Sequence, residues 1–456
     1  MFKKILVANR GEIAVRIIRA CHELGIEVVS VYSEGDRDSL HVRLADEAVC
    51  IGPAPSRSSY LNTTAIISAA LVTRSEAIHP GYGFLAENAN FSEACEQSDL
   101  VFIGPRPEAI RLMGDKAMAR KAMQEAGVPV VPGSDGIIES LEQARNVTQK
   151  MGFPMIMKAK DGGGGKGMRI VWSESELESA FAMATAEAEA AFGSGAMYME
   201  RFLEKPRHVE IQVAADSEGN VVHFYERDCS IQRRHQKLLE ESPCPILTKE
   251  KRAQLTDTAV RGAQGIGYSS LGTMEFLLDE DGSFYFMEMN TRLLVEHPVT
   301  EMITGRDLVR LQISIAAGNS LPFLQQDIQL SGHAIECRIN AEDPRRNFRP
   351  VPGPIRFFHA PGGPGVRVDS HLYSGYSVPS HYDSLLAKII VKDDERGAAI
   401  ARMKRALDEL VIEGIPTTAT FHIDVMQNED FIIGKNVDTG FLRKYMPQYD
   451  SSRKKE

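Results

Sequence analysis

Side chains that could do chemistry are concentrated in one stretch of this 456-residue chain, residues 284–298, which read FYFMEMNTRLLVEHP. At the two-residue period of a strand, Glu288 and Asn290 would point to the same face as the phenylalanines that precede them. Burial of an unpaired carboxylate costs several kcal/mol, so a glutamate between two methionines is expected to have a cation beside it. The stretch therefore predicts a metal ion or an arginine partner for Glu288.

A second carboxylate is expected opposite Glu288. If residues 280–283 form a hairpin loop, Glu275 pairs with Glu288. The same register pairs Leu277 with Phe286. Paired Cβ atoms lie roughly 4.5 to 5.5 Å apart, and two carboxylates at that distance repel unless a cation separates them. Mg²⁺ or Mn²⁺ is the cation that such oxygen ligands favour. Two carboxylates at a rim facing water are the weaker alternative, because Leu277 and Phe286 would share their face.

A glycine-rich loop points to phosphate binding. Residues 161–167 read DGGGGKG and follow the strand-like PMIMKAK, which carries Lys158. Runs of glycine lose much backbone entropy and occur where backbone approaches a ligand or moves over it. Gly167 stands where a Walker A loop needs Ser or Thr, so the loop is interpreted as a lid over nucleotide phosphates, with Lys158 as a point charge. A plain linker is disfavoured by the strand-loop-strand setting.

For two further motifs, a ligand-binding role and a purely structural role are equally well supported by the sequence. Residues 233–237 read RRHQK. On one strand, alternation would place Arg233, His235 and Lys237 on a common face suited to an anion, although a solvated basic patch explains the composition equally well. Residues 79–84 read HPGYGF and follow a short apolar strand, where open α/β sheets bind ligands. A plain connecting turn is an equal alternative there.

The composition is that of an acidic soluble protein. A formal charge of −10 and a pI near 5.7 disfavour a nucleic-acid or membrane-surface role. Six scattered cysteines without a CxxC motif fit free thiols in a reducing compartment. No secretory signal and no apolar run of about 18 residues is visible, so we expect a cytoplasmic protein.

The elements that would position these side chains begin with an open parallel sheet. Residues 3–32 predict a strand, a turn at Gly11, an amphipathic helix ending near Gly25 and a second strand. The turn lacks GxGxxG, so dinucleotide binding is only weakly indicated. The length allows two or three domains. We expect a fold of the α/β and α+β classes, with a boundary near Gly114 and a small lobe between Pro132 and Leu203.

With these residues in view, the chain resembles the biotin carboxylase subunit of biotin-dependent carboxylases of the acetyl-CoA carboxylase or pyruvate carboxylase type, within the ATP-grasp superfamily. The similarity spans nearly the whole chain and is carried by ILVANRGEIAVRIIRA, HPGYGFLAEN, GPRPEAIRLMGDK, GGGGKGM, PRHVEIQ, RDCSIQRRHQK, MEMNTR, VEHPVTEMITG and HYDSLLAK.

The resemblance implies three domains. They are a Rossmann-like open sheet (residues 1–113), an ATP-grasp domain (114–329) with a mobile lid (about 131–203), and a C-terminal mixed α+β domain (330–447). The implied activity is a ligase reaction: biotin on a separate carrier is carboxylated with bicarbonate and ATP, as the first half-reaction of an acyl-CoA or pyruvate-type carboxylase. Fatty acid biosynthesis is the implied setting of the acetyl-CoA type.

The resemblance also implies roles for individual residues. The catalytic group comprises Lys237, Arg292, the general base Glu296, and Arg338, which would face the ureido oxygen of biotin. ATP would be bound by Lys116, Lys158, Gly164, Gly165, Glu200, Arg201, Phe202, Leu203, His208, Gln232, His235 and Leu277. Bicarbonate and biotin would contact Lys237, Arg292, Val295, Arg338, Tyr82 and Gly83. Two Mg²⁺ or Mn²⁺ ions would be held by Glu275, Glu288 and Asn290.

Three features depart from the family pattern. Leu294 stands where the family has Gln, and loss of one neutral hydrogen bond costs about 0.5 to 1.5 kcal/mol, so we expect weaker bicarbonate binding. Arg19, Glu23 and Arg367 match the family's dimer contacts, but Pro364 replaces a common aromatic residue, so we expect a homodimer of reduced strength. No AMKM-type biotinylation segment or carboxyltransferase region is present, which implies a biotin carboxyl carrier protein and carboxyltransferase subunits as partners.

Two other functions remain open from the residues. An ATP-grasp ligase that joins a carboxylate to an amine would use the same lid and metal pair, but Arg338 and the HPGYGF loop argue against it. A catalytically silent nucleotide-binding subunit is disfavoured by the presence of Glu296, Arg292 and Lys237.

Overall fold

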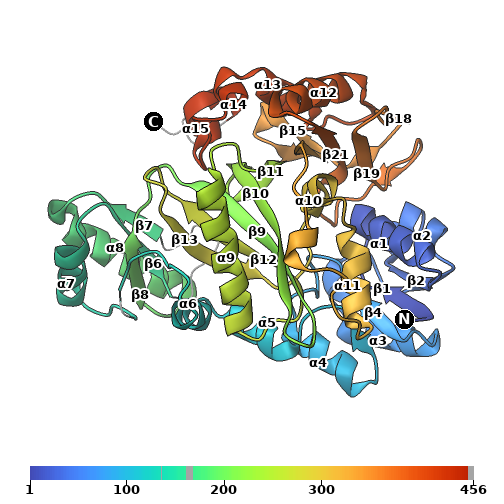
Figure 1. Cartoon of the computed structure of the whole chain (residues 1–456), viewed down its shortest axis with the longest axis horizontal. Helices are drawn as coiled ribbons and strands as arrows, with labels where there is room; N and C mark the ends of the chain where they lie inside the picture. Colours follow the sequence, from blue (N-terminus) through green and yellow to red (C-terminus); the bar gives the residue numbers. More distant parts are fainter. Residues whose placement is uncertain (135, 161–167, 450–456) are drawn as a thin grey trace.

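The structure is a computed structural model that describes residues 1–134, 136–160 and 168–449. Gly164 and Gly165 of the expected lid lie outside the described residues. Within the described ranges, no helix is long and apolar enough to cross a membrane. Figure 1 shows the N-terminal part, the C-terminal helices and a small lobe arranged around a central sheet.

The N-terminal part is an open parallel sheet, as the sequence predicted. Within residues 1–134, five strands lie in the order β3-β2-β1-β4-β5. The helix after β1 ends two residues before Gly25, whose φ of +70° is the left-handed conformation that glycine adopts readily. The strands are β1 (Lys4–Val7), β2 (Glu27–Tyr32), β3 (Glu47–Cys50), β4 (Ala77–His79) and β5 (Val101–Phe102). The helices are α1 (Gly11–Glu23), α2 (Leu40–Leu44), α3 (Thr63–Val72), α4 (Ala89–Gln97) and α5 (Pro107–Gly114).

The strand order places a switch point between β1 and β4, because the chain moves outward in opposite directions from these neighbours. The carboxyl ends of strands at such a point form the usual ligand crevice of open α/β sheets. Here the crevice edge holds the HPGYGF loop, whose carbonyls at Pro80 and Tyr82 both accept 2.7 Å hydrogen bonds from Asn9 Nδ2. The loop is therefore fastened to the end of β1.

The central sheet carries the three predicted metal ligands together with His208, Lys237 and Arg338. Across the described residues 204–449, eight strands lie in the order β13-β12-β9-β10-β11-β14-β21-β19. The sheet continues past residue 330, so strands of the C-terminal part extend the sheet that begins at β9. Its strands are β9 (Arg207–Ala215), β10 (Val221–Arg233), β11 (Gln236–Ser242), β12 (Ser270–Leu278), β13 (Phe284–Asn290), β14 (His333–Asn340), β19 (Val366–Ser370) and β21 (Leu385–Asp393).

The hairpin of β12 and β13 has the predicted carboxylate pair but not the whole predicted register. Glu275 pairs with Glu288, as expected, whereas Phe286 pairs with Phe276 rather than with Leu277. An extra residue, Met287, lies between the two registers and forms a bulge. The bulge reverses the alternation, so Phe286 joins the apolar core while Glu288 and Asn290 point to the other face.

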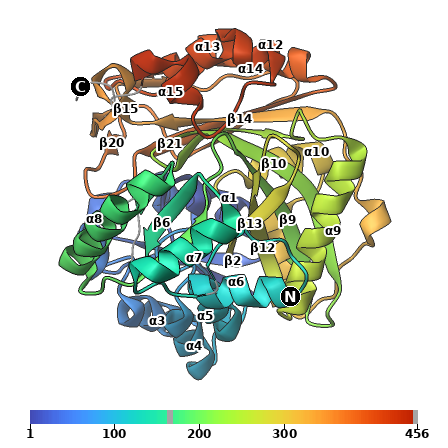
Figure 2. The same ribbon diagram turned by 90° about the vertical axis from the view of Figure 1, so that its left-hand side faces the viewer.

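Helices cover the central sheet on both sides of the site. The core between the sheet and α9 includes Phe276, Met274 and Leu255, and a second core lies between the sheet and the C-terminal helices. Figure 2 shows α12 to α14 lying over β14 and β21. The helices are α6 (Lys116–Glu125), α9 (Lys249–Gly265), α10 (His297–Thr304), α11 (Leu308–Ala316), α12 (Arg396–Glu409), α13 (Ala419–Gln427), α14 (Glu429–Ile433) and α15 (Phe441–Tyr445).

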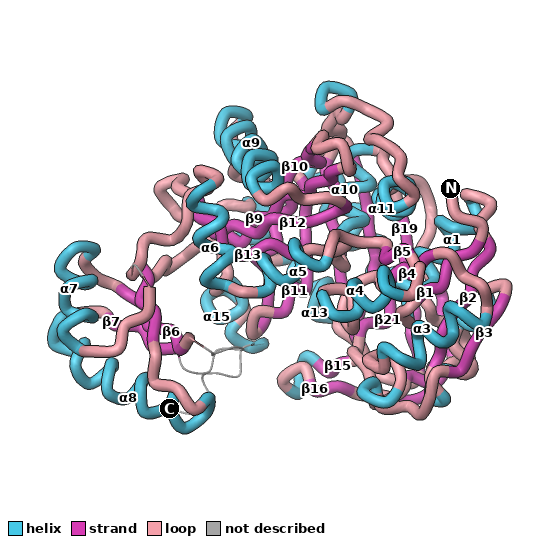
Figure 3. Tube along the Cα trace, turned by 90° about the horizontal axis from the view of Figure 1, so that it is seen from below, coloured by secondary structure: helices cyan, strands magenta, loops and turns pink. Residues whose placement is uncertain are grey.

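The described residues between Leu141 and Arg201, 141–160 and 168–201, form a separate lobe with its own core. Methionines of the strands pack against alanines and Leu177 of α8. Figure 3 shows the lobe standing apart from the N-terminal sheet. Its elements are α7 (Leu141–Met151), β6 (Met155–Ala159), β7 (Met168–Val171), α8 (Glu174–Phe192) and β8 (Met197–Arg201), with the strands in the order β7-β6-β8.

Short strands complete the C-terminal part. Two-stranded pairs join β15 to β16, β17 to β20 and β18 to β22. They are β15 (Glu342–Asp343), β16 (Arg349–Pro350), β17 (Gly353–Pro354), β18 (Phe357–His359), β20 (Ser377–Val378) and β22 (Val411–Glu413).

Candidate active site

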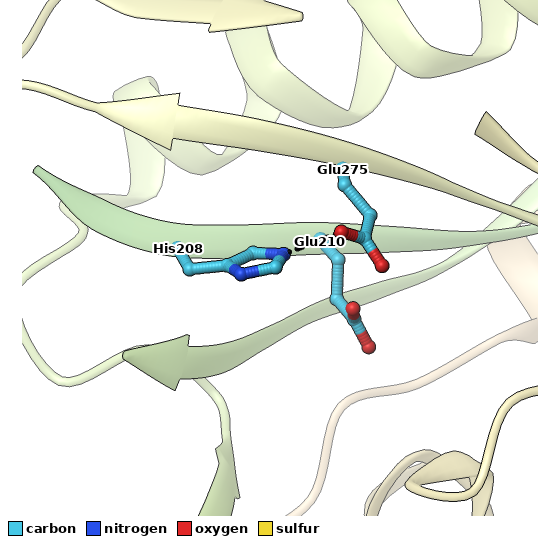
Figure 4. Close-up of side chains that lie close together, drawn as sticks. All are labelled: His208, Glu210 and Glu275. Carbon is cyan, nitrogen blue, oxygen red and sulfur yellow. Dashed lines mark ion pairs between the residues drawn. The ribbon is translucent and has the colours of Figure 1, made fainter. Parts of the chain in front are cut away.

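Glu275 is a buried carboxylate surrounded by donors. It is 3 % exposed on β12. His208 Nε2 lies 2.8 Å from its Oε2, while Lys237 Nζ and Asn290 Nδ2 donate to its Oε1 at 2.9 and 2.7 Å. Figure 4 shows His208, Glu210 and Glu275 projecting together from neighbouring strands. Burial alone would raise the pKa of Glu275, but the charges of Lys237 and His208 hold that pKa well below its usual range.

Glu288, the partner of Glu275 across the hairpin, is in a different state. Its side chain is exposed, and no cation among the described residues pairs with it. Desolvation against the sheet and the negative charge of Glu275 raise the pKa of Glu288. Glu275, Glu288 and Asn290, here called the hairpin cluster, therefore contain a carboxylate, Glu288, that has no ion-pair partner among the described residues.

A second group, the acid–base cluster of Lys237, Glu240, Glu296 and Arg338, lies deeper in the sheet. Glu296 is 2 % exposed and precedes α10. Lys237 Nζ donates to one oxygen of Glu296 at 2.6 Å, and Arg338 donates to the other at 3.0 Å. Although burial opposes ionisation, the charges of Lys237 and Arg338 hold the pKa of Glu296 well below its usual value. Glu296 is therefore an ionised carboxylate between two cations.

Arg338 is shared between two carboxylates. Its Nε donates to Glu240 Oε1 at 2.6 Å, and its Nη2 lies between Glu240 and Glu296 Oε2. Glu240 and Glu336 are cross-strand partners on β11 and β14, and both are fully buried. Burial and the charge of Glu296 outweigh Arg338 and raise the pKa of Glu240 to about 7. Burial likewise raises the pKa of Glu336 well above its usual value. The positive charge of Lys388 opposes this rise, and the negative charge of Glu240 adds to it.

Arg292 lies between the hairpin cluster and the N-terminal part. Its Nε donates to Glu87 Oε2 at 2.7 Å, and an Nη donates to Asn290 Oδ1 at 3.0 Å. The other oxygen of Glu87 accepts a 3.0 Å hydrogen bond from the backbone N–H of Thr291. The Arg292 side chain is about one-fifth exposed, and its remaining nitrogen donates to the carbonyl of Leu293 at 3.3 Å.

The predicted nucleotide-binding residues fall into two places. Lys158 on β6 pairs with Glu200 on β8, and Arg120 approaches the same carboxylate at 3.4 Å. Arg201, Phe202 and Leu203 follow directly, where the chain leaves the lobe for the central sheet. Lys116, the first residue of α6, is exposed. On the central sheet, Leu277 pairs with His208 on the neighbouring strand β9.

The prediction that Arg233, His235 and Lys237 share a strand face was wrong. Arg234 and His235 both have positive φ and form the tight turn between β10 and β11. Lys237 is instead the cross-strand partner of Gln232, while Arg233 pairs with Gln236. Lys237 therefore reaches the acid–base cluster from β11, and His235 lies exposed at the turn.

Several site residues were not identified from the sequence. Glu210 is fully buried on β9, binds Lys237, and pairs with the buried guanidinium of Arg227. Glu87, Glu210 and Glu240 each bind a residue that is distant in sequence. The only available signal was an acidic residue inside an otherwise apolar strand, as in HVEIQV for Glu210.

The structure combines a small α/β lobe joined to an antiparallel sheet, a hairpin with paired carboxylates, and buried cations of a kind that suits phosphates. Together the fold and the site define an enzyme of the ATP-grasp class. Family models agree: residues 1–110 match the biotin carboxylase N-terminal domain, residues 115–324 the ATP-binding domain of the carbamoyl-phosphate synthase L chain, and residues 336–444 the biotin carboxylase C-terminal domain.

Individual relatives cover almost the whole chain. Biotin carboxylase 1 of Bacillus subtilis is 56 % identical over 98 % of this chain and 99 % of its own length. A crystal structure of biotin carboxylase from Campylobacter jejuni is 52 % identical, covers 97 % of this chain and 99 % of its own, and has a TM-score of 0.91. The biotin carboxylase domain dimer of the Hydrogenobacter thermophilus 2-oxoglutarate carboxylase, in complex with MgADP, ADP and bicarbonate, is 50 % identical, covers 99 % of each chain and has a TM-score of 0.91. The chain belongs to the biotin carboxylase family and is an ATP-dependent ligase of that kind.

Proposed function

We propose that the chain carboxylates biotin held on a separate biotin carboxyl carrier protein, with bicarbonate and ATP, through carboxyphosphate. The observation that carries this proposal is the acid–base cluster, in which an ionised, buried Glu296 lies between Lys237 and Arg338. A carboxylate held in this way can accept a proton while the flanking cations stabilise anionic substrates.

The hairpin cluster fits a divalent cation. Its donor oxygens come from two cross-strand carboxylates, and the raised pKa of Glu288 reflects repulsion that a cation would relieve. Glu275, Glu288 and Asn290 would hold two Mg²⁺ or Mn²⁺ ions. When bound, such ions neutralise charge on the phosphoryl group during its transfer.

ATP would lie between the lobe and the sheet. Lys116, Lys158 and the glycines at 164 and 165 would contact its phosphates, with His235 and Gln232 nearby. Glu200, Arg201, Phe202 and Leu203 connect the lobe to the sheet and would bind adenine largely through main chain, while His208 would hold the ribose beside Leu277. The ion pair between Lys158 and Glu200 supports this placement. It brings the Lys158 ammonium next to residues 200–203, which connect the lobe to the central sheet.

In the first step, Arg292 and the Val295 backbone would hold bicarbonate while Glu296 removes its proton. A bicarbonate oxygen then attacks the γ-phosphorus of ATP and the bond to the ADP oxygen breaks, which yields carboxyphosphate and ADP. Lys237 stabilises the charge on the transferring group.

In the second step, the C–O bond of carboxyphosphate breaks to give CO₂ and phosphate. The phosphate takes the proton from the ureido nitrogen of biotin, and that nitrogen attacks CO₂. Arg338 stabilises the negative charge on the ureido oxygen, and Tyr82 and Gly83 line the biotin side. Closure of the lobe would exclude water from the intermediate.

The partners follow from the same proposal. Carboxylated biotin would pass to carboxyltransferase subunits, and fatty acid biosynthesis in the cytoplasm is the setting if the final acceptor is acetyl-CoA. Arg19, Glu23 and Arg367 line one surface hollow of about 380 Å³, which supports this face as the homodimer contact. The proposed domain limits are 1–113, 114–329 and 330–447, with the lid at about 131–203.

The test is ATP hydrolysis by the purified chain. We expect hydrolysis that requires bicarbonate and is stimulated by free biotin. Indifference to both, with stimulation by an amine acceptor, would favour an amine ligase instead. Binding of ATP without turnover under any of these conditions would indicate a silent nucleotide-binding subunit.

A further inference from the structure

One buried cation near the site is not needed by the mechanism above. Lys388 on β21 has a side chain that is 0 % exposed. Its Nζ donates to the carbonyl of Val295 at 2.9 Å and lies 3.1 Å from Glu12 Oε1. A buried ammonium is costly unless it is paired and hydrogen-bonded, and these contacts meet that requirement.

Glu12 links Lys388 to the HPGYGF loop. It stands in the first turn of α1, at the switch point between β1 and β4, where open sheets usually bind a ligand. Its Oε1 accepts a hydrogen bond from the hydroxyl of Tyr82. Its Oε2 is buried and has no hydrogen-bond partner among the described residues. Glu12 therefore contacts both Tyr82 and Lys388 through one carboxylate oxygen.

These contacts form one continuous path from the Val295 carbonyl through Lys388 and Glu12 to Tyr82. Val295 and Tyr82 are 213 positions apart in the chain, and the proposed function places bicarbonate beside one and biotin beside the other. Each end of the path is also constrained separately. The Tyr82 carbonyl is held by Asn9, and the residue after Val295 is held by Lys237.

We propose that Lys388 and Glu12 are positioning residues that hold the Tyr82 loop at a set distance from the Val295 backbone, and so present biotin to the carboxyl group. This inference rests on the proposed function. Reaction between two bound groups depends steeply on their separation, and a shift of 1 Å can cost on the order of 100-fold in rate. The path sets that separation without touching either substrate.

The proposal requires a control for ordinary destabilisation, because removing Lys388 leaves Glu12 buried and unpaired. Arg252 on α9 supplies one. It pairs with the fully buried Glu226 at 2.8 Å, so Arg252→Met also leaves a buried glutamate without its cation. That pair has no contact with Tyr82 or Val295 among the described residues.

The experiment compares Lys388→Met, Tyr82→Phe, their double variant and Arg252→Met in the full chain. For Lys388→Met we expect at least a tenfold loss of biotin-stimulated ATP hydrolysis with an unchanged KM for ATP. The double variant should lose little more than the larger single loss, because both changes cut the same path. Arg252→Met should lower the Tm comparably and keep the biotin stimulation.

Hydrogen exchange of the amides in residues 81–86 provides a readout that is independent of turnover. We expect faster exchange there in Lys388→Met and not in Arg252→Met. Unchanged exchange of these amides in Lys388→Met would overturn the positioning role. So would an equal loss of biotin stimulation in Lys388→Met and Arg252→Met when the two variants have the same Tm. Absence of biotin-stimulated turnover in the unaltered protein would count against the proposed function, while exchange would still decide whether Lys388 fixes the loop.

Discussion

The hairpin cluster and the acid–base cluster differ in how far the protein neutralises its own charges. In the acid–base cluster, Glu296 has a cation on each oxygen and is ionised before any substrate arrives. In the hairpin cluster, Glu275 has such partners, but Glu288 is exposed and its pKa is raised.

The difference shows which half of the site is preorganised. Ionised groups that are fixed before the reaction stabilise a transition state without further reorganisation. A carboxylate without a counter-charge is instead completed by its ligand. Under the proposed function, the acid–base cluster would act with charges that the chain itself supplies, while the hairpin cluster would be completed by a divalent cation from solution.

The largest expected effect is that of Glu296→Gln on the acid–base cluster. The amide keeps the size of the side chain but cannot accept the bicarbonate proton. Loss of a general base typically costs about 10² to 10⁴ in rate. Bicarbonate-dependent ATP hydrolysis should fall by that factor, with the Mg²⁺ concentration for half-maximal rate unchanged. A near-normal rate would remove Glu296 from the mechanism.

Arg338→Gln should be the most destabilising change in the same cluster. It leaves Glu240 and Glu296 sharing a buried space without their common cation, and breaking a buried pair in this way costs roughly 3 to 5 kcal/mol. A lower Tm and loss of biotin stimulation are expected. Adding Glu240→Gln should recover part of the Tm and none of the biotin stimulation. Full recovery of both would mean that Arg338 serves only as a structural counter-ion.

Glu288→Gln should have opposite effects with and without a divalent cation. Because the folded-state pKa of Glu288 is raised, its contribution to stability is present below its unfolded pKa near 4.5 and is lost as the pH rises through the folded value. The metal-free variant should therefore be more stable than the unaltered protein at pH 8 and equal to it at pH 4.

In the ATP hydrolysis assay, the Mg²⁺ concentration that gives half-maximal rate should be at least roughly tenfold higher for the same variant than for the unaltered protein. Thermal melts with and without Mg²⁺ and a Mg²⁺ titration of activity measure the two effects. An unchanged Mg²⁺ requirement would exclude Glu288 as a ligand and would make the two clusters alike.

The smallest expected effect is that of Leu294→Gln, at the position that departs from the family pattern. Leu294 is 4 % exposed, and its carbonyl is held by His297. A new neutral hydrogen bond to bicarbonate is worth about 0.5 to 1.5 kcal/mol, so the bicarbonate KM should fall roughly 2- to 10-fold. An unchanged or higher KM, measured in the ATP hydrolysis assay, would show that Leu294 is not a lost contact.

The same two clusters show what sequence reasoning could reach. The pairing of Glu275 with Glu288, counted from a loop at residues 280–283, was correct because a bulge at Met287 offsets a one-residue error near that loop. The register nearer the loop was wrong by one residue, since a bulge at Met287 leaves no mark in the alternation of apolar residues. The bulge also explains why Phe286 is in the core while Glu288 is not.

Three members of the acid–base cluster, Lys237, Glu296 and Arg338, were predicted, but Glu240 and the contacts between the four residues were not. Glu296, which precedes α10, and Arg338 on β14 lie 42 positions apart, and Glu240 joins them from β11. No local period encodes such contacts, which arise from strand order in the sheet. The turn at Arg234 and His235 was missed because positive φ is rare outside Gly, Asn and Asp. The roles given to the site residues stay predictions.

The most direct test of the central claim follows the oxygen atoms of bicarbonate. Purified chain would be supplied with ATP, Mg²⁺, free biotin and ¹⁸O-labelled bicarbonate, and the products would be analysed by mass spectrometry. We predict one labelled oxygen in the phosphate released and two in the carboxyl group of carboxybiotin, because carboxyphosphate keeps one bicarbonate oxygen on phosphorus. Phosphate without label, or no carboxybiotin, would contradict the account.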